Sequence, residues 1–383
     1  MIELPLGFTA HVANMGVKDD SQDVMIVASH EPASVAAVFT KSRFSGPSVT
    51  LSREHVADGS AQAVVVISKN ANVATGAQGA ANAAEVADLV AAAVGCAATE
   101  VVVGSTGVIG VQYPMERIRA HLGAVRGPFS GRSAEDVATA MMTTDTHRKV
   151  AEARAGGTRV VGMAKGVGMI EPDMATMIAV ITTDAEITPG DLDACFRRVV
   201  DVTFNALSVD SDTSTSDMAV LLASGAAGRV DPEEFEAALG QVCLDLTRQL
   251  AADGEGAETL IVVRVQGARD TAQAKLIAKS IVNSPLVKTA VHGRDPNWGR
   301  VAMAVGKCSD QTDIDPDRVV IRFGALEVYP TPASPSALAE LEEYLARDEV
   351  LIGVDLGIAD GSFTVYGCDL TDGYVRINAD YTT

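Results

Sequence analysis

Basic residues are scarce in this 383-residue chain, which has 30 Lys and Arg against 50 Asp and Glu. The resulting formal net charge of −20 argues against nucleic-acid binding, because neutralising phosphates requires clustered Lys and Arg. The same charge disfavours docking to an anionic membrane surface, and it favours solubility. We therefore expect no nucleic-acid partner and no membrane partner.

Cysteine and histidine are also few, and they are not spaced as ligands. The five cysteines include no pair at zinc-site or redox-motif spacing. The six histidines form no HxxxH or similar pair, so a structural metal site is not expected. We expect reduced thiols, no metal and a cytoplasmic location.

Long apolar runs and standard catalytic signatures are missing as well. No apolar stretch reaches about 18 residues, the length that spans a membrane. The first residues, Met1–Pro5, contain no basic region followed by the apolar core of a secretory signal. The chain has no GxSxG elbow, no P-loop, no GxGxxG after a strand and no HExxH. No standard catalytic set is therefore recognised.

The chain does contain the strand and helix patterns of a globular protein, and it is long enough for two or three domains. Separate strands are expected at 24–28, 36–40 and 63–68, and helices are expected to begin near Ser133, Thr188 and Asp231. The chain beyond Lys307 is typical of a smaller α/β unit. The single tryptophan, Trp298, is expected in an ordered loop framed by Pro and Gly.

The most informative stretch runs from Lys165 through a Gly-Val-Gly loop and Glu171-Pro172-Asp173 into an apolar run, 174–181, that predicts a buried strand. Thr176 lies at the start of that strand, where threonine is also an ordinary strand residue. As a nucleophile, a threonine hydroxyl needs a base. Its own α-amine, freed if the preceding peptide bond is cut, would titrate near 8 and could serve. Lys165 would lower the pKa of that amine further by like-charge repulsion.

Three other segments offer polar groups that could line a site. After the strand pattern at 101–103, Gly104-Ser105-Thr106-Gly107 is either an oxyanion-binding turn or a plain glycine turn. Met141 to Thr146, at the end of a helix, form either a pocket floor or a capping network. Glu255, just beyond a helix end where the helix dipole disfavours an acid, either holds an ammonium group or is a solvated loop acid. The acidic, hydroxyl-rich tract 210–217 predicts a hydrogen-bonded turn rather than a calcium loop.

The stretch 165–176 resembles the self-cleavage motif of the ornithine acetyltransferase (glutamate N-acetyltransferase) family. Six further blocks resemble that family in the same order, so that the resemblance covers nearly the whole chain; they are 105–110, 142–146, 212–215, 253–257, 295–300 and 378–383. The resemblance implies an α/β fold of the ornithine acetyltransferase type, with mixed sheets packed with helices and a smaller C-terminal α/β domain. It also implies acetyl transfer from N-acetyl-L-ornithine to L-glutamate, without a cofactor.

The resemblance assigns roles to individual residues. Thr176 would attack the Ala175 carbonyl, split the chain by an N-to-O acyl shift and then carry the acetyl group. Thr106 and Gly107 would stabilise the oxyanion. The residues that would contact the substrate are Thr144, Lys165, Thr176, Glu255, Asn378 and Thr383, with Thr143 an alternative to Thr144.

The same resemblance implies two chains that stay together after cleavage, residues 1–175 and residues 176–383, the part from about residue 270 onward forming the smaller domain. The pairs would assemble into α2β2 or a larger oligomer. Three alternatives remain: an aminopeptidase or amidase that passes the acyl group to water, a bifunctional enzyme that also uses acetyl-CoA, and an uncut binding protein.

Overall fold

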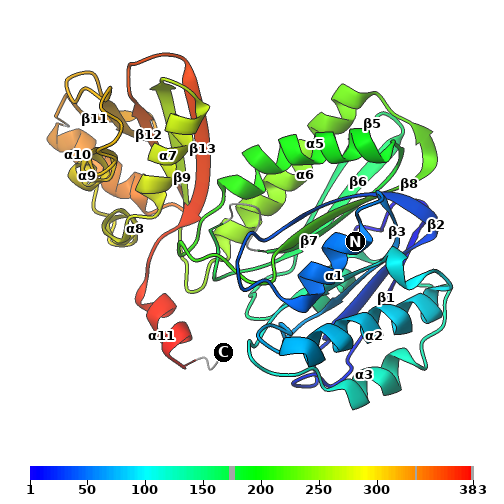
Figure 1. Cartoon of the computed structure of the whole chain (residues 1–383). Coiled ribbons are helices and arrows are strands. Elements are labelled where there is room, and N and C mark those ends of the chain that lie inside the picture. The colour runs from blue at the N-terminus through cyan, green and yellow to red at the C-terminus, as the bar shows by residue number, and fades with distance from the viewer. Residues whose placement is uncertain (172–176, 333, 381–383) are drawn as a thin grey trace.

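The computed structural model describes residues 1–171, 177–332 and 334–380. It shows a mixed α/β protein with a larger and a smaller sheet, each packed with helices (Figure 1). This confirms the expected fold class. No helix in these ranges is long and apolar enough to cross a membrane.

The described residues form a larger sheet of eight strands, in the order β4-β3-β2-β8-β7-β6-β5 with β1 beside β2. Its strands are β1 (Phe8–Ala13), β2 (Val24–Phe39), β3 (Ser60–Ile67), β4 (Val101–Ser105), β5 (Lys149–Ala155), β6 (Thr158–Lys165), β7 (Ile178–Glu186) and β8 (Met218–Arg229). The pairs β3–β4 and β7–β8 are parallel, and the other neighbours are antiparallel. The central strands are apolar on both faces, as expected for strands covered on both sides.

Helices cover both faces of this sheet, and side chains alternate between the two cores as the period of a strand requires. On β2, Val38 joins one core, whereas Ala37 and Phe39 join the other. The helices and short 3-10 turns of this part are α1 (Pro47–His55), α2 (Gly76–Val94), η1 (Ala98–Glu100), α3 (Met115–Leu122), α4 (Ala134–Met141), α5 (Pro189–Val202), η2 (Phe204–Ala206) and α6 (Pro232–Ala252).

The helix starts at Ser133, Thr188 and Asp231 are confirmed. Each of these side chains accepts a hydrogen bond from a backbone N–H of the first helical turn. The expected strands at 24–28 and 36–40 are instead one strand, β2. It pairs with β3 from Val24 to Ser34, with a register shift between Ala28 and Ala33, and with β8 from Ser34 to Phe39.

The smaller sheet has the order β11-β10-β12-β9-β13 among the described residues, with β9 and β12 parallel and the other pairs antiparallel. Its elements are β9 (Leu260–Ala268), α7 (Thr271–Val282), α8 (Pro285–His292), α9 (Trp298–Gly306), β10 (Val320–Phe323), β11 (Leu326–Tyr329), α10 (Pro335–Leu345), β12 (Glu349–Asp355) and β13 (Gly361–Cys368). The sheet takes in β9, which precedes residue 270 in the chain. Trp298 is the first residue of α9 and not part of a loop, because the Asn297 side chain caps that helix by accepting from Arg300 N.

The chain leaves β13 and returns toward the larger sheet as the helix α11 (Asp372–Asp380), drawn in red in Figure 1. None of its residues is buried. This return places the C-terminal segment beside residues that lie far earlier in the sequence.

Candidate active site

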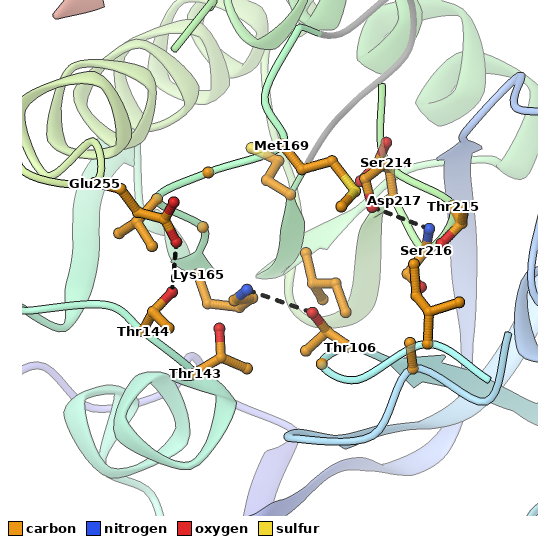
Figure 2. A pocket seen from close by; sticks show the side chains of 18 of the residues that line it. Thr106, Thr143, Thr144, Lys165, Met169, Ser214, Thr215, Ser216, Asp217 and Glu255 are labelled. Atoms are coloured by element: carbon orange, nitrogen blue, oxygen red, sulfur yellow. Dashed lines mark hydrogen bonds between the residues drawn. The ribbon is translucent and has the colours of Figure 1, made fainter. Parts of the chain in front are cut away.

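A cavity of about 130 Å³ lies where several loops meet at the edge of the larger sheet (Figure 2). Its lining combines apolar residues and glycines with ten polar or charged side chains: Thr106, Thr143, Thr144, Lys165, Ser214, Thr215, Ser216, Asp217, Glu255 and Asn378.

One wall is the turn that follows β4. The Thr106 N–H donates to the Ile67 carbonyl, which leaves the Thr106 hydroxyl as the group that faces the cavity. Gly107 has a φ of +131°, and a Cβ there would collide with the backbone of Lys69, so only glycine fits. Among the described residues, the Gly107 N–H has no hydrogen-bond partner. The turn thus offers one amide and one hydroxyl, the donor types that an oxyanion hole uses.

Lys165 is the last residue of β6, and its ammonium reaches into the cavity from the sheet. Its Nζ lies 3.4 Å from Thr106 Oγ1, although β4 and β6 are far apart in the strand order. Burial lowers the pKa of Lys165, while the negative charges of Asp145, Asp217 and Glu255 oppose that shift. The Lys165 amine is therefore buried among three acids.

Beneath Lys165 lies a buried ionic network. Asp145 Oδ1 accepts from Lys149 Nζ at 2.8 Å and from Gly166 N at 2.7 Å, and its Oδ2 accepts from Thr143 N. Lys149 Nζ also donates to Asp253 Oδ2 at 2.5 Å. Burial alone would raise the pKa of Asp145, but Lys165 and Lys149 outweigh it and hold the pKa below its usual 3.8. Asp145 thus fixes both the turn at Thr143 and the loop after Lys165.

We expect Asp145→Asn to destabilise the fold by about 3–5 kcal/mol at pH 7.5, because it removes the charge from one member of a buried ionic network. The folded-state pKa of Asp145 is lowered, so its stabilising contribution is fully present above pH 3.8 and is lost as the pH falls through the folded value. Urea unfolding should therefore show a gap between wild type and variant that is constant from pH 7.5 to about 5 and closes below about 3.8. A gap unchanged at pH 3 would contradict this assignment.

Glu255 lies in the turn after α6, opposite Thr106 in the cavity (Figure 2). Its Oε1 accepts from Thr144 Oγ1 at 3.2 Å, and its Oε2 accepts from Asn378 Nδ2 at 2.9 Å. The Glu255 N–H donates to the Val167 carbonyl. Two side chains from separate parts of the chain thus hold the carboxylate, and a third segment holds its backbone, so Glu255 is no loose loop acid. Thr143 also lines the cavity, but the hydroxyl that reaches Glu255 is that of Thr144.

The segment that leads out of the Lys165 loop is held by Asp210, whose role the sequence did not indicate. Its two carboxylate oxygens accept from the amides of Met169 and Ile170, at 2.6 and 2.7 Å. Asp210 also accepts from the Asp212 amide, as in the hydrogen-bonded turn that the sequence favoured. Asp145 lies in the family-like block 142–146 and Asp210 at the start of the tract 210–217, but only their contacts reveal that they hold loops.

The structure brings together six of the residues that the resemblance assigned to the site: Thr106, Gly107, Thr144, Lys165, Glu255 and, from α11, Asn378. Ala175, Thr176 and Thr383 lie outside the described residues. Met177, which directly follows Thr176 in the sequence, lines the cavity, as does Ile178 at the start of β7. The strand expected from residue 174 thus begins at Ile178 as far as it is described.

Comparison with known proteins supports the resemblance. The sequence profile of the ArgJ family matches residues 9–383. "Glutamate N-acetyltransferase Oat2" of Streptomyces clavuligerus is 58% identical, over 99% of this chain and 98% of its own length. The "Arginine biosynthesis bifunctional protein ArgJ" of Rhodococcoides fascians is 51% identical, over 99% of this chain and 94% of its own length. A solved ornithine acetyltransferase of Mycobacterium tuberculosis, complexed with ornithine, is 32% identical, with a TM-score of 0.39, over 45% of this chain and 94% of that chain. From the profile match over residues 9–383 and the two full-length relatives at 58% and 51% identity, this chain belongs to the ArgJ family.

Proposed function

We propose that this protein is a glutamate N-acetyltransferase that moves the acetyl group of N-acetyl-L-ornithine to L-glutamate. The observation that carries this proposal is the pairing of one held carboxylate, Glu255, with one buried ammonium, Lys165, in the same small cavity. Amino-acid substrates carry both signs of charge. A cavity with a fixed anion and a fixed cation is complementary to such molecules and orients them.

The charges also fit the two substrates. N-acetylornithine has a free side-chain ammonium and a carboxylate, which Glu255 and Lys165 respectively complement. Glutamate has a carboxylate at each end of the molecule and no side-chain ammonium. Its α-amine accepts the acetyl group. Because the donor is an amide and the product is an amide of similar acyl-transfer potential, the exchange requires no cofactor.

The reaction would proceed in two halves through an ester on Thr176. Its hydroxyl attacks the acetyl carbonyl of N-acetylornithine, and the Gly107 amide and Thr106 hydroxyl stabilise the oxyanion, each such donor contributing about 3–4 kcal/mol. The freed α-amine of Thr176 takes the proton and returns it to the leaving amine. Glutamate then attacks the ester and leaves as N-acetylglutamate, so the kinetics are ping-pong.

The freed α-amine requires cleavage between Ala175 and Thr176, which would give chains 1–175 and 176–383. The sheet supports a pair that stays together. Lys165 of β6 and Ile178 of β7 are register partners across the cut, and β8 pairs with β2 on the other side. Strands of the second chain thus lie between strands of the first. Further association into α2β2 or a larger oligomer is part of the proposal and can be measured by light scattering.

The proposal also places the enzyme in the cytoplasm, in line with five cysteines that form no disulfide. An assay with N-acetylornithine, with and without glutamate, tests the reaction itself. Transfer predicts ornithine release that depends on glutamate and yields N-acetylglutamate one for one. Acetate release that glutamate does not change would show an amidase instead. The same assay with acetyl-CoA in place of N-acetylornithine tests the bifunctional alternative.

We expect Glu255→Gln to raise the KM for N-acetylornithine about 10- to 100-fold, because a charge-assisted hydrogen bond to the substrate ammonium is lost. The KM for glutamate should change much less, since glutamate has no side-chain ammonium. Steady-state kinetics at varied concentrations of each substrate measure both. Glu233→Gln, an exposed acid in the first turn of α6, is the matched control and should match wild type. Equal KM increases for the two substrates would contradict the assigned role.

A further inference from the structure

A second group of side chains that could bind a metal ion lies outside the cavity, beside the smaller sheet. Glu258 precedes β9, His292 is the last residue of α8, and Asp369 directly follows β13. His292 Nδ1 lies 3.3 Å from Asp369 Oδ2 and 3.7 Å from Glu258 Oε2. No local sequence pattern indicates this group, because its members are separated by long stretches of chain. Within the described ranges it is the one set of three such residues whose ligand atoms all lie within 4.8 Å of one another.

Two buried atoms of this group lack a hydrogen-bond partner among the described residues. The Asp369 side chain has no exposed surface, and its Oδ1 accepts from the amides of Glu258 and Thr259 at 2.9 and 3.0 Å. Neither its Oδ2 nor His292 Nδ1 has a hydrogen-bond partner among the described residues. The two atoms are near each other, yet their alignment is not that of a hydrogen bond. A buried polar atom without a partner is costly, so both atoms point to something that joins them.

The spacing fits a metal ion. Two ligands of one tetrahedral zinc ion, each at about 2.0–2.2 Å, lie roughly 3.3–3.6 Å apart. The observed distances from His292 Nδ1 to Asp369 Oδ2 and to Glu258 Oε2, 3.3 and 3.7 Å, are close to that ligand–ligand distance. We propose that Glu258, His292 and Asp369 form a site for one divalent cation of the zinc class, with His292 Nδ1 and one oxygen from each carboxylate as ligands and a water molecule in the fourth position. Imidazole and carboxylate together suit this class of ion better than Mg²⁺ or Ca²⁺, which prefer all-oxygen sites.

The charge balance agrees with this site. Two carboxylates and a neutral imidazole offer two negative charges to a divalent cation. The nearest lysine on α8, Lys288, lies one turn before His292, and its ammonium donates to the carbonyls of Val209 and Cys368. Its charge is thus engaged by backbone oxygens.

A cation here would join three segments: the residues before β9, the end of α8 and the residues after β13. The last of these is where the chain leaves the smaller sheet. Just beyond Asp369, Thr371 Oγ1 donates to the Gly256 carbonyl at 2.6 Å, and the chain then enters α11, which carries Asn378 to the cavity. The ion would therefore brace the connection between the smaller sheet and that helix. It would take no part in acetyl transfer, and its presence does not depend on the proposed reaction.

Calorimetric titration of the chelator-treated mature protein with ZnCl2 tests the site. We expect one zinc ion per copy of the sequence, and at least tenfold weaker binding in Glu258→Gln and in Asp369→Asn. Glu258 is exposed, and an Asn at 369 can still accept from the amides of Glu258 and Thr259, so both variants should fold. Zinc should raise the Tm of wild type but not of these variants. His30→Ala, an exposed histidine elsewhere, should bind as wild type does.

Cobalt substitution excludes a thiol site. The Co²⁺ complex should show d–d absorption without a thiolate-to-cobalt charge-transfer band. Equal zinc affinity in wild type, Glu258→Gln and Asp369→Asn would overturn the proposal. So would a charge-transfer band that disappears in a cysteine variant, since it would place the ion on a thiol.

Discussion

Replacing Thr176 with alanine should leave the chain whole, at its full 383 residues, and abolish acetyl transfer. Without the hydroxyl, nothing attacks the Ala175 carbonyl, so no ester forms and no α-amine is released. The same change removes the group that would carry the acetyl intermediate. Intact-mass spectrometry measures the first effect, and the N-acetylornithine–glutamate assay measures the second.

The precursor should still fold, because the strands on either side of the cut, β6 and β7, are paired directly with each other. Circular dichroism of the variant should match that of wild type. Thr139→Ala is a suitable control, since the Thr139 hydroxyl only donates to the Glu135 carbonyl within α4, and this variant should be cut and active. Two chains in Thr176→Ala, or turnover by it, would show that another residue is the nucleophile.

Gly107→Ala should lower kcat roughly 100- to 1,000-fold, the loss typical of one oxyanion donor. An added Cβ would collide with the backbone of Lys69, and the φ of +131° is strained for any residue other than glycine. The turn must therefore shift, and its free N–H moves away from the position where the oxyanion forms. Single-turnover acetylation by N-acetylornithine isolates the step that should slow.

Two further variants separate this effect from a general loss of structure. Gly110→Ala has a positive φ of +82° but open space around the added Cβ, so it tests backbone strain alone and should keep most of its activity. Thr106→Val removes the neighbouring hydroxyl at constant volume, and it should reduce kcat with little loss of stability. A folded Gly107→Ala enzyme with kcat within about threefold of wild type would rule out the amide as an oxyanion donor.

Much of the architecture was predictable from local pattern. The capping residues Ser133, Thr188 and Asp231 predict their helices correctly, because a capping side-chain oxygen and the first amides of its helix are neighbours in sequence. For residues 24–39 the apolar pattern predicts two strands instead of the one observed, because the exposed middle, His30–Pro32, interrupts that pattern. The pattern around Trp298 predicts a loop where the structure has the start of α9, because the neighbouring Pro and Gly residues are typical of loops as well as of helix ends.

The residues of the site were likewise predictable from the sequence only in part. The resemblance assigned Thr106, Gly107, Thr144, Lys165 and Glu255 to one site, and the structure does bring these residues to one cavity. The resemblance did not indicate that Asp145 fixes the Thr143 turn and the Gly166 loop together, or that Asp210 holds the amides of Met169 and Ile170. The structure shows both contacts. Those functions depend on contacts between residues that no local pattern relates.

The sequence by itself determined the class of protein, the family, the helix caps and the residue types of the site, because each of these depends on neighbours in the chain or on recognisable motifs. Only the tertiary structure decided which charges meet. It placed Lys165 beside Thr106, held Glu255 between Thr144 and Asn378, and brought Glu258, His292 and Asp369 together. The physical reason is that electrostatic and hydrogen-bond energies depend on distances in space, and these are set by how the sheets and helices pack rather than by separation along the chain.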